Sequence, residues 1–147
     1  MSVRFQLVID CTDPDRLARF WAAALGYELA PAPAGFATWN DFYRALGLPE
    51  EELVDGADRI SDPRGHGPSV WFHAVPEAKV VKNRLHLDIH ASGDRADPFE
   101  VRKARVEAEA ERLVALGATR TVVMQQEGVD HYAVGMQDPE GNEFDVN

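Results

Sequence analysis

An internal repeat constrains the fold of this chain more than any other feature of its sequence. Each half reads as strand, Asp-Pro, helix, Leu-Gly, strands, Asp-Pro-x-Gly and strand. A βαβββ unit leaves one sheet face uncovered, so two units are expected to pair and cover each other. The matched signals are Asp13-Pro14 with Asp97-Pro98, Leu25-Gly26 with Leu116-Gly117, and Asp62-Pro63-Arg64-Gly65 with Asp138-Pro139-Glu140-Gly141.

The repeat predicts an α+β fold with two βαβββ modules related by pseudo-two-fold symmetry. Their mixed or antiparallel sheets would form a cup with the helices outside, and the cleft between the modules is the expected ligand site. We expect a single domain over residues 1–147, with module one at about 3–78 and module two at about 83–147. Whether the modules pair within one chain or between chains stays open.

Module one begins with a strand over residues 5–10 and a helix that starts at Asp13. Asp13 is a suitable N-cap, and Pro14 fits the first helical turn, where its missing N–H has no cost. Gly26 is placed to end the helix in the left-handed conformation. The apolar side chains fall at helical spacing and predict a buried stripe that includes Trp21; they are Leu17, Phe20, Trp21, Ala24 and Leu25.

An aromatic insertion over residues 36–52 interrupts module one. Aromatic and apolar residues at helical spacing predict a short helix before Gly47. The favoured interpretation is that this face packs on the core. The alternative is a lid whose aromatic side chains close a small-molecule pocket, because long insertions in compact domains are often functional. The residues that form the face are Phe36, Trp39, Phe42, Tyr43 and Leu46.

Module two opens with alternating apolar and ionisable residues over 83–90, the period of a β-strand with one buried face. The ionisable face could line a pocket floor or converge on a metal, or it could be an ordinary solvated face of an antiparallel sheet. His86 could equally be a core histidine bonded to Asp88. The apolar positions are Leu85, Leu87 and Ile89, and the ionisable ones are Arg84, His86, Asp88 and His90.

The rest of module two predicts a helix from Asp97, a hairpin and a terminal strand. The hairpin strands cover 121–124 and 131–136 around the turn at 128–130. Phe144 and Val146 alternate with polar residues in the last strand. The apolar helix positions are Val101, Ala104, Val106, Ala108, Ala110, Leu113 and Leu116.

Composition narrows the function classes. A net charge of -10 with scattered Lys and Arg disfavours nucleic acid as a partner. The single Cys11 excludes an internal disulfide, and with no secretory start or long apolar run the expected location is the cytoplasm, away from membranes. The common nucleotide, hydrolase, redox and zinc-protease motifs are absent from the sequence.

The repeat, with its matched helix-start, helix-end and turn signals, resembles the vicinal-oxygen-chelate superfamily, which contains glyoxalase I, extradiol dioxygenases and bleomycin- or fosfomycin-resistance proteins. Within it, the chain is similar to a glyoxalase-like branch of largely uncharacterised function. The resemblance covers nearly the whole chain and rests most on residues 5–27, 83–88, 113–118 and 138–145. It is specific for fold and weak for reaction, because this fold hosts many chemistries.

The resemblance implies one metal ligand from the first and one from the last strand of each module. These positions fall on Gln6, His86 and Asp145, with His73 as the best donor in 70–75, where residues 66–69 make the register uncertain. Such a set suits Zn, Ni, Fe, Co or Mn. The same residues are equally compatible with a site that binds no metal ion. Asp145 stands where relatives carry a Glu that is both ligand and catalytic base, and its side chain is one methylene shorter.

Two functions follow from the resemblance. The first is a metal-dependent lyase, isomerase or dioxygenase for a small oxygenated molecule. The second is a metal-free binding or sequestering protein in which Trp39 and Trp71 hold the ligand; the negative charge mildly favours a cationic one. Arg84 and Asp88 are further candidates for substrate binding. A regulatory or assembly role also stays open, and the resemblance implies a homodimer.

Overall fold

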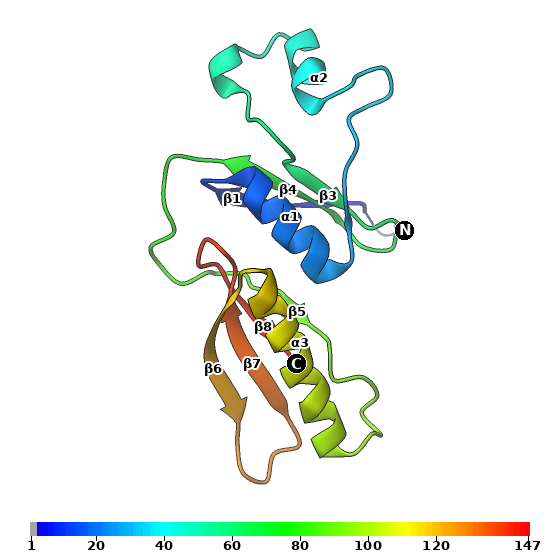
Figure 1. The fold of residues 1–147 in the computed structure, drawn as a ribbon, viewed down its shortest axis with the longest axis vertical. Coiled ribbons are helices and arrows are strands. Elements are labelled where there is room, and N and C mark those ends of the chain that lie inside the picture. The colour runs from blue at the N-terminus through cyan, green and yellow to red at the C-terminus, as the bar shows by residue number, and fades with distance from the viewer. Residues whose placement is uncertain (1–2) are drawn as a thin grey trace. The chain divides into compact units, whose positions relative to one another are not determined.

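The computed structural model describes residues 3–147 and divides into two compact units, Met1–Ala78 and Lys79–Asn147 (Figure 1). Each unit contains one β-strand, one long helix and three further strands, in the order that the repeat predicts. Each unit also holds a four-stranded sheet of mixed direction. The predicted α+β fold with two βαβββ modules is therefore confirmed.

The sheet of unit 1 has the strand order β1-β4-β3-β2. The first strand runs parallel to β4, while β3 is antiparallel to both of its neighbours. The elements are β1 (Gln6–Cys11), α1 (Pro14–Leu25), β2 (Glu28–Leu29), β3 (Arg59–Ser61) and β4 (Ser69–Ala74).

Helix α1 forms as the sequence predicts. Asp13 caps it by accepting a hydrogen bond from the backbone N–H of Arg16 at 3.0 Å, and Gly26 ends it with a φ of 66°. Leu17 and Trp21 lie on its buried face, with Trp21 only 3% exposed. This face covers one side of the sheet against Val70 and Phe72 of β4, both of which are buried.

The insertion of unit 1 differs from its favoured prediction. It forms α2 (Trp39–Ala45) and the short 3₁₀ helix η1 (Glu50–Glu52), and neither contains a buried residue. The aromatic rings pack mainly on one another, with Phe42 in edge-on contact with both Phe36 and Trp39. Packing on the core was therefore the wrong prediction, because the helix lies on the polar side of the sheet, opposite α1.

Unit 2 repeats this topology with the strand order β5-β8-β7-β6. The parallel pair is β5 with β8, and the other pairs are antiparallel. The predicted hairpin and the alternating terminal strand are both present. The elements are β5 (Asp88–Ile89), α3 (Phe99–Leu116), β6 (Thr119–Gln125), β7 (Tyr132–Gln137) and β8 (Glu143–Val146).

Helix α3 buries only part of the predicted apolar set. Val106, Ala110 and Leu113 are buried, but Val101 is exposed and the charged Arg102 is buried instead. Arg102 donates to the carbonyl oxygen of Asp97 and forms an ion pair with Asp130, so its charge is compensated. The helix begins at Phe99, after Pro98 and without a side-chain cap.

The predicted strand over 83–90 is largely irregular. Only Asp88 and Ile89 form β5, and Leu85 is 82% exposed. Strand pairing is absent at Asn83 because its backbone N–H donates to the side-chain carboxylate of Glu143 in β8, at 3.0 Å, and not to a backbone carbonyl. Backbone pairing begins only at Leu87, whose carbonyl accepts the N–H of Asp145.

Within residues 3–147, no helix is both long enough and apolar enough to cross a membrane.

Candidate functional site

A histidine and two carboxylates meet on the polar face of unit 2. His86 Nε2 lies 3.4 Å from Asp88 Oδ1 and 3.4 Å from Asp145 Oδ2. One ligand atom from each of the three residues lies within 4.8 Å of the other two. The side chains of His86 and Asp88 are 44% exposed and that of Asp145 is 29% exposed, so the cluster is accessible from solvent.

The strand register explains why the three side chains meet. Asp88 of β5 stands opposite Asp145 of β8 in the parallel pair, and successive side chains of a strand point to opposite faces. His86 lies two residues before Asp88, on the same side as both carboxylates. Two of these three, His86 and Asp145, are residues for which the sequence predicts a metal site, and Asp88 was predicted to bind substrate.

A second set of contacts fixes the irregular segment that carries His86. Glu143 accepts a hydrogen bond from the Asn83 backbone and forms an ion pair with Lys79 Nζ at 3.1 Å. The hydrogen bond from Asn83, followed by that from Lys79, lowers the pKa of Glu143 to about 2. Glu143 is therefore a negative anchor at neutral pH, and it ties 79–83 to β8.

Asn147 holds the second oxygen of Asp88. Its Nδ2 donates to Asp88 Oδ2 at 3.2 Å, and its Oδ1 contacts His90 Nδ1 at 2.7 Å. Since the amide nitrogen donates to the carboxylate, the amide oxygen must accept from a protonated Nδ1 of His90. Asp88 thereby keeps Oδ1 directed at His86. Sequence reasoning missed this role of Asn147, which the last strand offers only as one of its alternating polar residues.

The donor set fits a divalent cation. A tetrahedral ion with bonds of about 2.0–2.2 Å separates neighbouring ligand atoms by about 3.3–3.6 Å. The two distances of 3.4 Å around His86 Nε2 match that separation. An imidazole nitrogen with two carboxylate oxygens suits Zn, Mn, Fe, Co or Ni, and three protein ligands leave positions open for substrate.

Unit 1 does not offer the same set. Gln6 stands opposite Ser69, and His73 stands opposite Asp10, four residues further along β4. A separation of four residues along a strand is about 13 Å, so Gln6 and His73 are not brought together. If Gln6 corresponds to His86, then the residue of β4 that corresponds to Asp145 is Trp71. His73 Nδ1 instead contacts Asp10 Oδ1 at 3.1 Å.

Unit 1 has an aromatic cavity of about 520 Å³ between the insertion and the sheet. Trp39, from α2, and Trp71, from β4, both line it, so the structure brings together the two tryptophans predicted to bind substrate. Trp39 is anchored by its Nε1, which donates to the carbonyl oxygen of Ala30 at 3.0 Å. The lid interpretation of the insertion is consistent with this cavity.

An ion pair that sequence reasoning did not identify lies at the base of the cavity. Asp58 Oδ2 accepts hydrogen bonds from Trp71 Nε1 at 3.1 Å and from the Tyr43 hydroxyl at 3.5 Å. Burial raises the pKa of Asp58 against the opposing effect of Arg59. The Arg59 guanidinium carbon lies 4.4 Å from the Trp39 ring centroid and 5.0 Å from that of Trp71. The two charged residues lie six and seven positions after the end of the insertion, and that position is their only sequence signal.

Arg84 takes no part in the ion pairs of the His86 cluster. It is exposed in the irregular segment before β5, and within residues 3–147 it forms no ion pair with Asp88 or Asp145. Its predicted role in binding a substrate carboxylate stays a prediction.

Two βαβββ modules in one chain are the architecture expected of the vicinal-oxygen-chelate superfamily. The chain belongs to this superfamily and, within it, to the glyoxalase-like domain family, whose sequence profile matches residues 6–147. No curated protein sequence matches the chain.

Solved structures agree with this fold. A glyoxalase/bleomycin resistance protein/dioxygenase family enzyme from Burkholderia phytofirmans PsJN is 17% identical with a TM-score of 0.55, covering 97% of this chain and 94% of its own. The fosfomycin resistance protein FosX from Listeria monocytogenes is 10% identical with a TM-score of 0.59, covering 99% and 92%. The oxidase ChaP-H2 is 16% identical with a TM-score of 0.54, covering 99% and 93%. At these identities the likeness concerns the fold.

Proposed function

We propose that this protein binds a divalent cation through His86, Asp88 and Asp145 and acts on a small oxygenated molecule as a lyase, isomerase or dioxygenase. The observation that carries the proposal is the pair of 3.4 Å distances from His86 Nε2 to the two carboxylates. A FosX structure was solved in complex with Mn(II) and 1S,2S-dihydroxypropylphosphonic acid, which supports a metal-dependent reaction for a protein of this fold.

The proposed chemistry divides between an ion and the side chains. When bound, a divalent ion supplies Lewis acidity that polarises a substrate oxygen. His86 and Asp88 hold the site, with the Oδ2 of Asp88 kept out of it by Asn147. Asp145 is the candidate catalytic residue, since a carboxylate at the site can take a proton from the carbon next to the polarised oxygen.

The test of this proposal is turnover that depends on added metal. Chelated protein would be reloaded separately with Mn, Fe, Co, Ni and Zn and tested on thiol hemiacetals, for isomerisation, and on catechols, for dioxygenation. Turnover that appears on reloading and is lost in Asp145→Asn supports the proposal. Metal binding without turnover on either substrate class would contradict the reaction classes that we assign.

A second candidate function is metal-free binding of a small molecule. The specific observation in its favour is the 520 Å³ cavity with Trp39 and Trp71 in its wall, a volume within the usual range for small-ligand sites. Ligand binding that is unchanged by chelation, with no turnover, would favour this candidate over the first.

A further inference from the structure

The residues of the aromatic cavity indicate which kind of ligand it could bind, and this inference does not depend on the proposed metal site. Every residue that lines the cavity belongs to unit 1, whereas His86, Asp88 and Asp145 belong to unit 2. The cavity therefore shares no residue with the candidate metal site.

The base of the cavity is aromatic and electrically balanced. The Arg59 Nη2 donates to the Tyr43 hydroxyl at 2.5 Å, and that hydroxyl donates to Asp58. Asp58 Oδ1 and Arg59 Nε lie 3.6 Å apart as an ion pair. Because the two charges compensate each other, the base has little net charge, and Trp39 and Trp71, each with the Arg59 guanidinium over one face of its ring, contribute their remaining apolar surface to the cavity.

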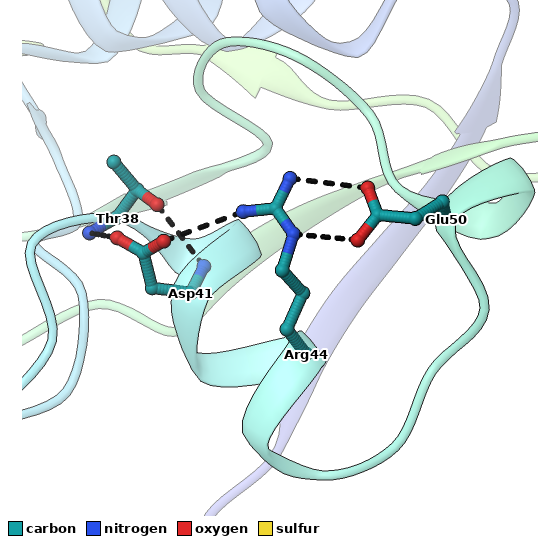
Figure 2. Close-up of polar contacts among 4 residues, drawn as sticks. All are labelled: Thr38, Asp41, Arg44 and Glu50. Carbon is teal, nitrogen blue, oxygen red and sulfur yellow. Dashed lines mark hydrogen bonds and ion pairs between the residues drawn. The ribbon is translucent and has the colours of Figure 1, made fainter.

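The rim of the cavity is negative. Among the three consecutive glutamates of η1, Glu50 is neutralised by Arg44, whose Nε and Nη2 donate to its two oxygens at 2.7 and 3.2 Å (Figure 2). Glu51 and Glu52 line the cavity, and within residues 3–147 their carboxylates form no hydrogen bond or ion pair. The rim thus presents two uncompensated negative charges beside an aromatic wall.

The insertion that carries these charges is held together by its own polar contacts. Thr38 and Asp41 form a capping box at the start of α2, with backbone to side-chain distances of 3.0 and 3.1 Å (Figure 2). Arg44 contacts Asp41 as well as Glu50, which joins α2 to η1. A preorganised site loses less conformational entropy on binding.

We propose that this cavity binds an amphiphilic organic cation, with a flat aromatic body against Trp39 and Trp71 and an ammonium or amidinium group at Glu51 and Glu52. The aromatic body gains apolar contact, and the cation gains two carboxylates that have no other partner among residues 3–147.

The experiment compares three naphthalene probes that differ in charge. Chelator-treated protein would be titrated by calorimetry with 2-naphthylmethylammonium, 2-naphthylmethanol and 2-naphthoate, so that the metal proposal does not affect the result. We expect the ammonium to bind about tenfold more tightly than the alcohol and the carboxylate to bind most weakly. The double substitution Glu51→Gln/Glu52→Gln should weaken ammonium binding about fivefold or more and leave the alcohol unchanged.

A matched control separates the site from net charge. The double substitution Glu100→Gln/Glu127→Gln changes the charge equally in unit 2 and should leave all three affinities unchanged. The proposal is overturned by equal binding of ammonium and alcohol, by tightest binding of the carboxylate, by no binding of any probe, or by equal effects of the two double variants.

Discussion

Asn147 orients Asp88, since its Nδ2 donates to Oδ2 of that carboxylate over 3.2 Å. The other oxygen of the carboxylate, Oδ1, is the one that lies 3.4 Å from His86 Nε2. The side chain of Asp88 therefore has one oxygen bound to the protein and one available at the candidate metal site. Partners of this kind commonly set the orientation, and hence the affinity, of metal ligands.

Replacing Asn147 with Ala should weaken metal binding without abolishing it. The Asp88 carboxylate would lose its orienting bond, and outer contacts of this type typically contribute about 10- to 100-fold in metal affinity. Competition with a chelating dye measures the dissociation constant directly. Gln126→Ala, an exposed amide in the hairpin turn, is the control and should have no effect. An unchanged affinity in the Asn147 variant would show that Asp88 needs no such support.

The insertion and the core should respond differently to loss of a tryptophan. Trp39→Leu removes the hydrogen bond to Ala30 and the contact with Arg59, so the insertion should loosen. No residue of α2 is buried, so the free energy of unfolding should fall by less than about 1 kcal/mol. Limited proteolysis should then cut within residues 36–58 at least about tenfold faster than in the parent protein.

Trp21→Leu is the matched comparison for the Trp39 variant. Trp21 is 3% exposed on α1, so its truncation leaves a core cavity and should cost about 2–4 kcal/mol in urea unfolding. Equal losses of unfolding free energy in the two variants would mean that the insertion is part of the cooperative core.

Glu107 should make the stability of the protein depend on pH. Its carboxylate accepts two hydrogen bonds from Arg120, at 2.7 and 3.0 Å, and one from the Tyr132 hydroxyl. These bonds, that from Arg120 first, lower the pKa of Glu107 below 4.5. A lowered pKa stabilises the folded state fully above the unfolded value near 4.5, and this contribution is lost as the pH falls through the folded value.

The measurement is urea unfolding of the parent protein and of Glu107→Gln at about pH 7 and about pH 3.5. We expect the variant to be less stable by about 1–2 kcal/mol at neutral pH, with the difference shrinking in acid. Glu100→Gln, at an exposed position of α3, should show no such trend. A difference that stays constant across the two pH values would assign the loss to packing.

The sequence predicts elements well where local signals and burial agree. Asp13, Pro14 and Gly26 bound α1 as expected, and Phe144 and Val146 form the buried side of β8. The segment before β5 was less predictable, because its alternation of polar and apolar residues is the same as that of a strand. The contact that replaces strand pairing there is made by Glu143, which lies 60 residues away from Asn83.

The candidate sites, too, could be predicted from the sequence only in part. His86 and Asp145 could be identified from the repeat, but the approach of Asp88 to both depends on a parallel register, which no local pattern specifies. The same register places Trp71, rather than His73, at the position of unit 1 that corresponds to Asp145. Residues 66–69 lengthen the turn before β4, so the register of β4 could not be predicted from the sequence. The two modules therefore share a fold while one carries carboxylates and the other carries aromatic rings.

The central claim is tested most directly by the metal content of the protein, measured by plasma mass spectrometry after chelation, reloading and gel filtration. We expect close to one divalent ion per chain in the parent protein and in His131→Ala, an exposed histidine outside the cluster, and almost none in His86→Ala. Absence of metal from the reloaded parent protein, or equal metal content in all three proteins, would contradict a metal site at His86, Asp88 and Asp145.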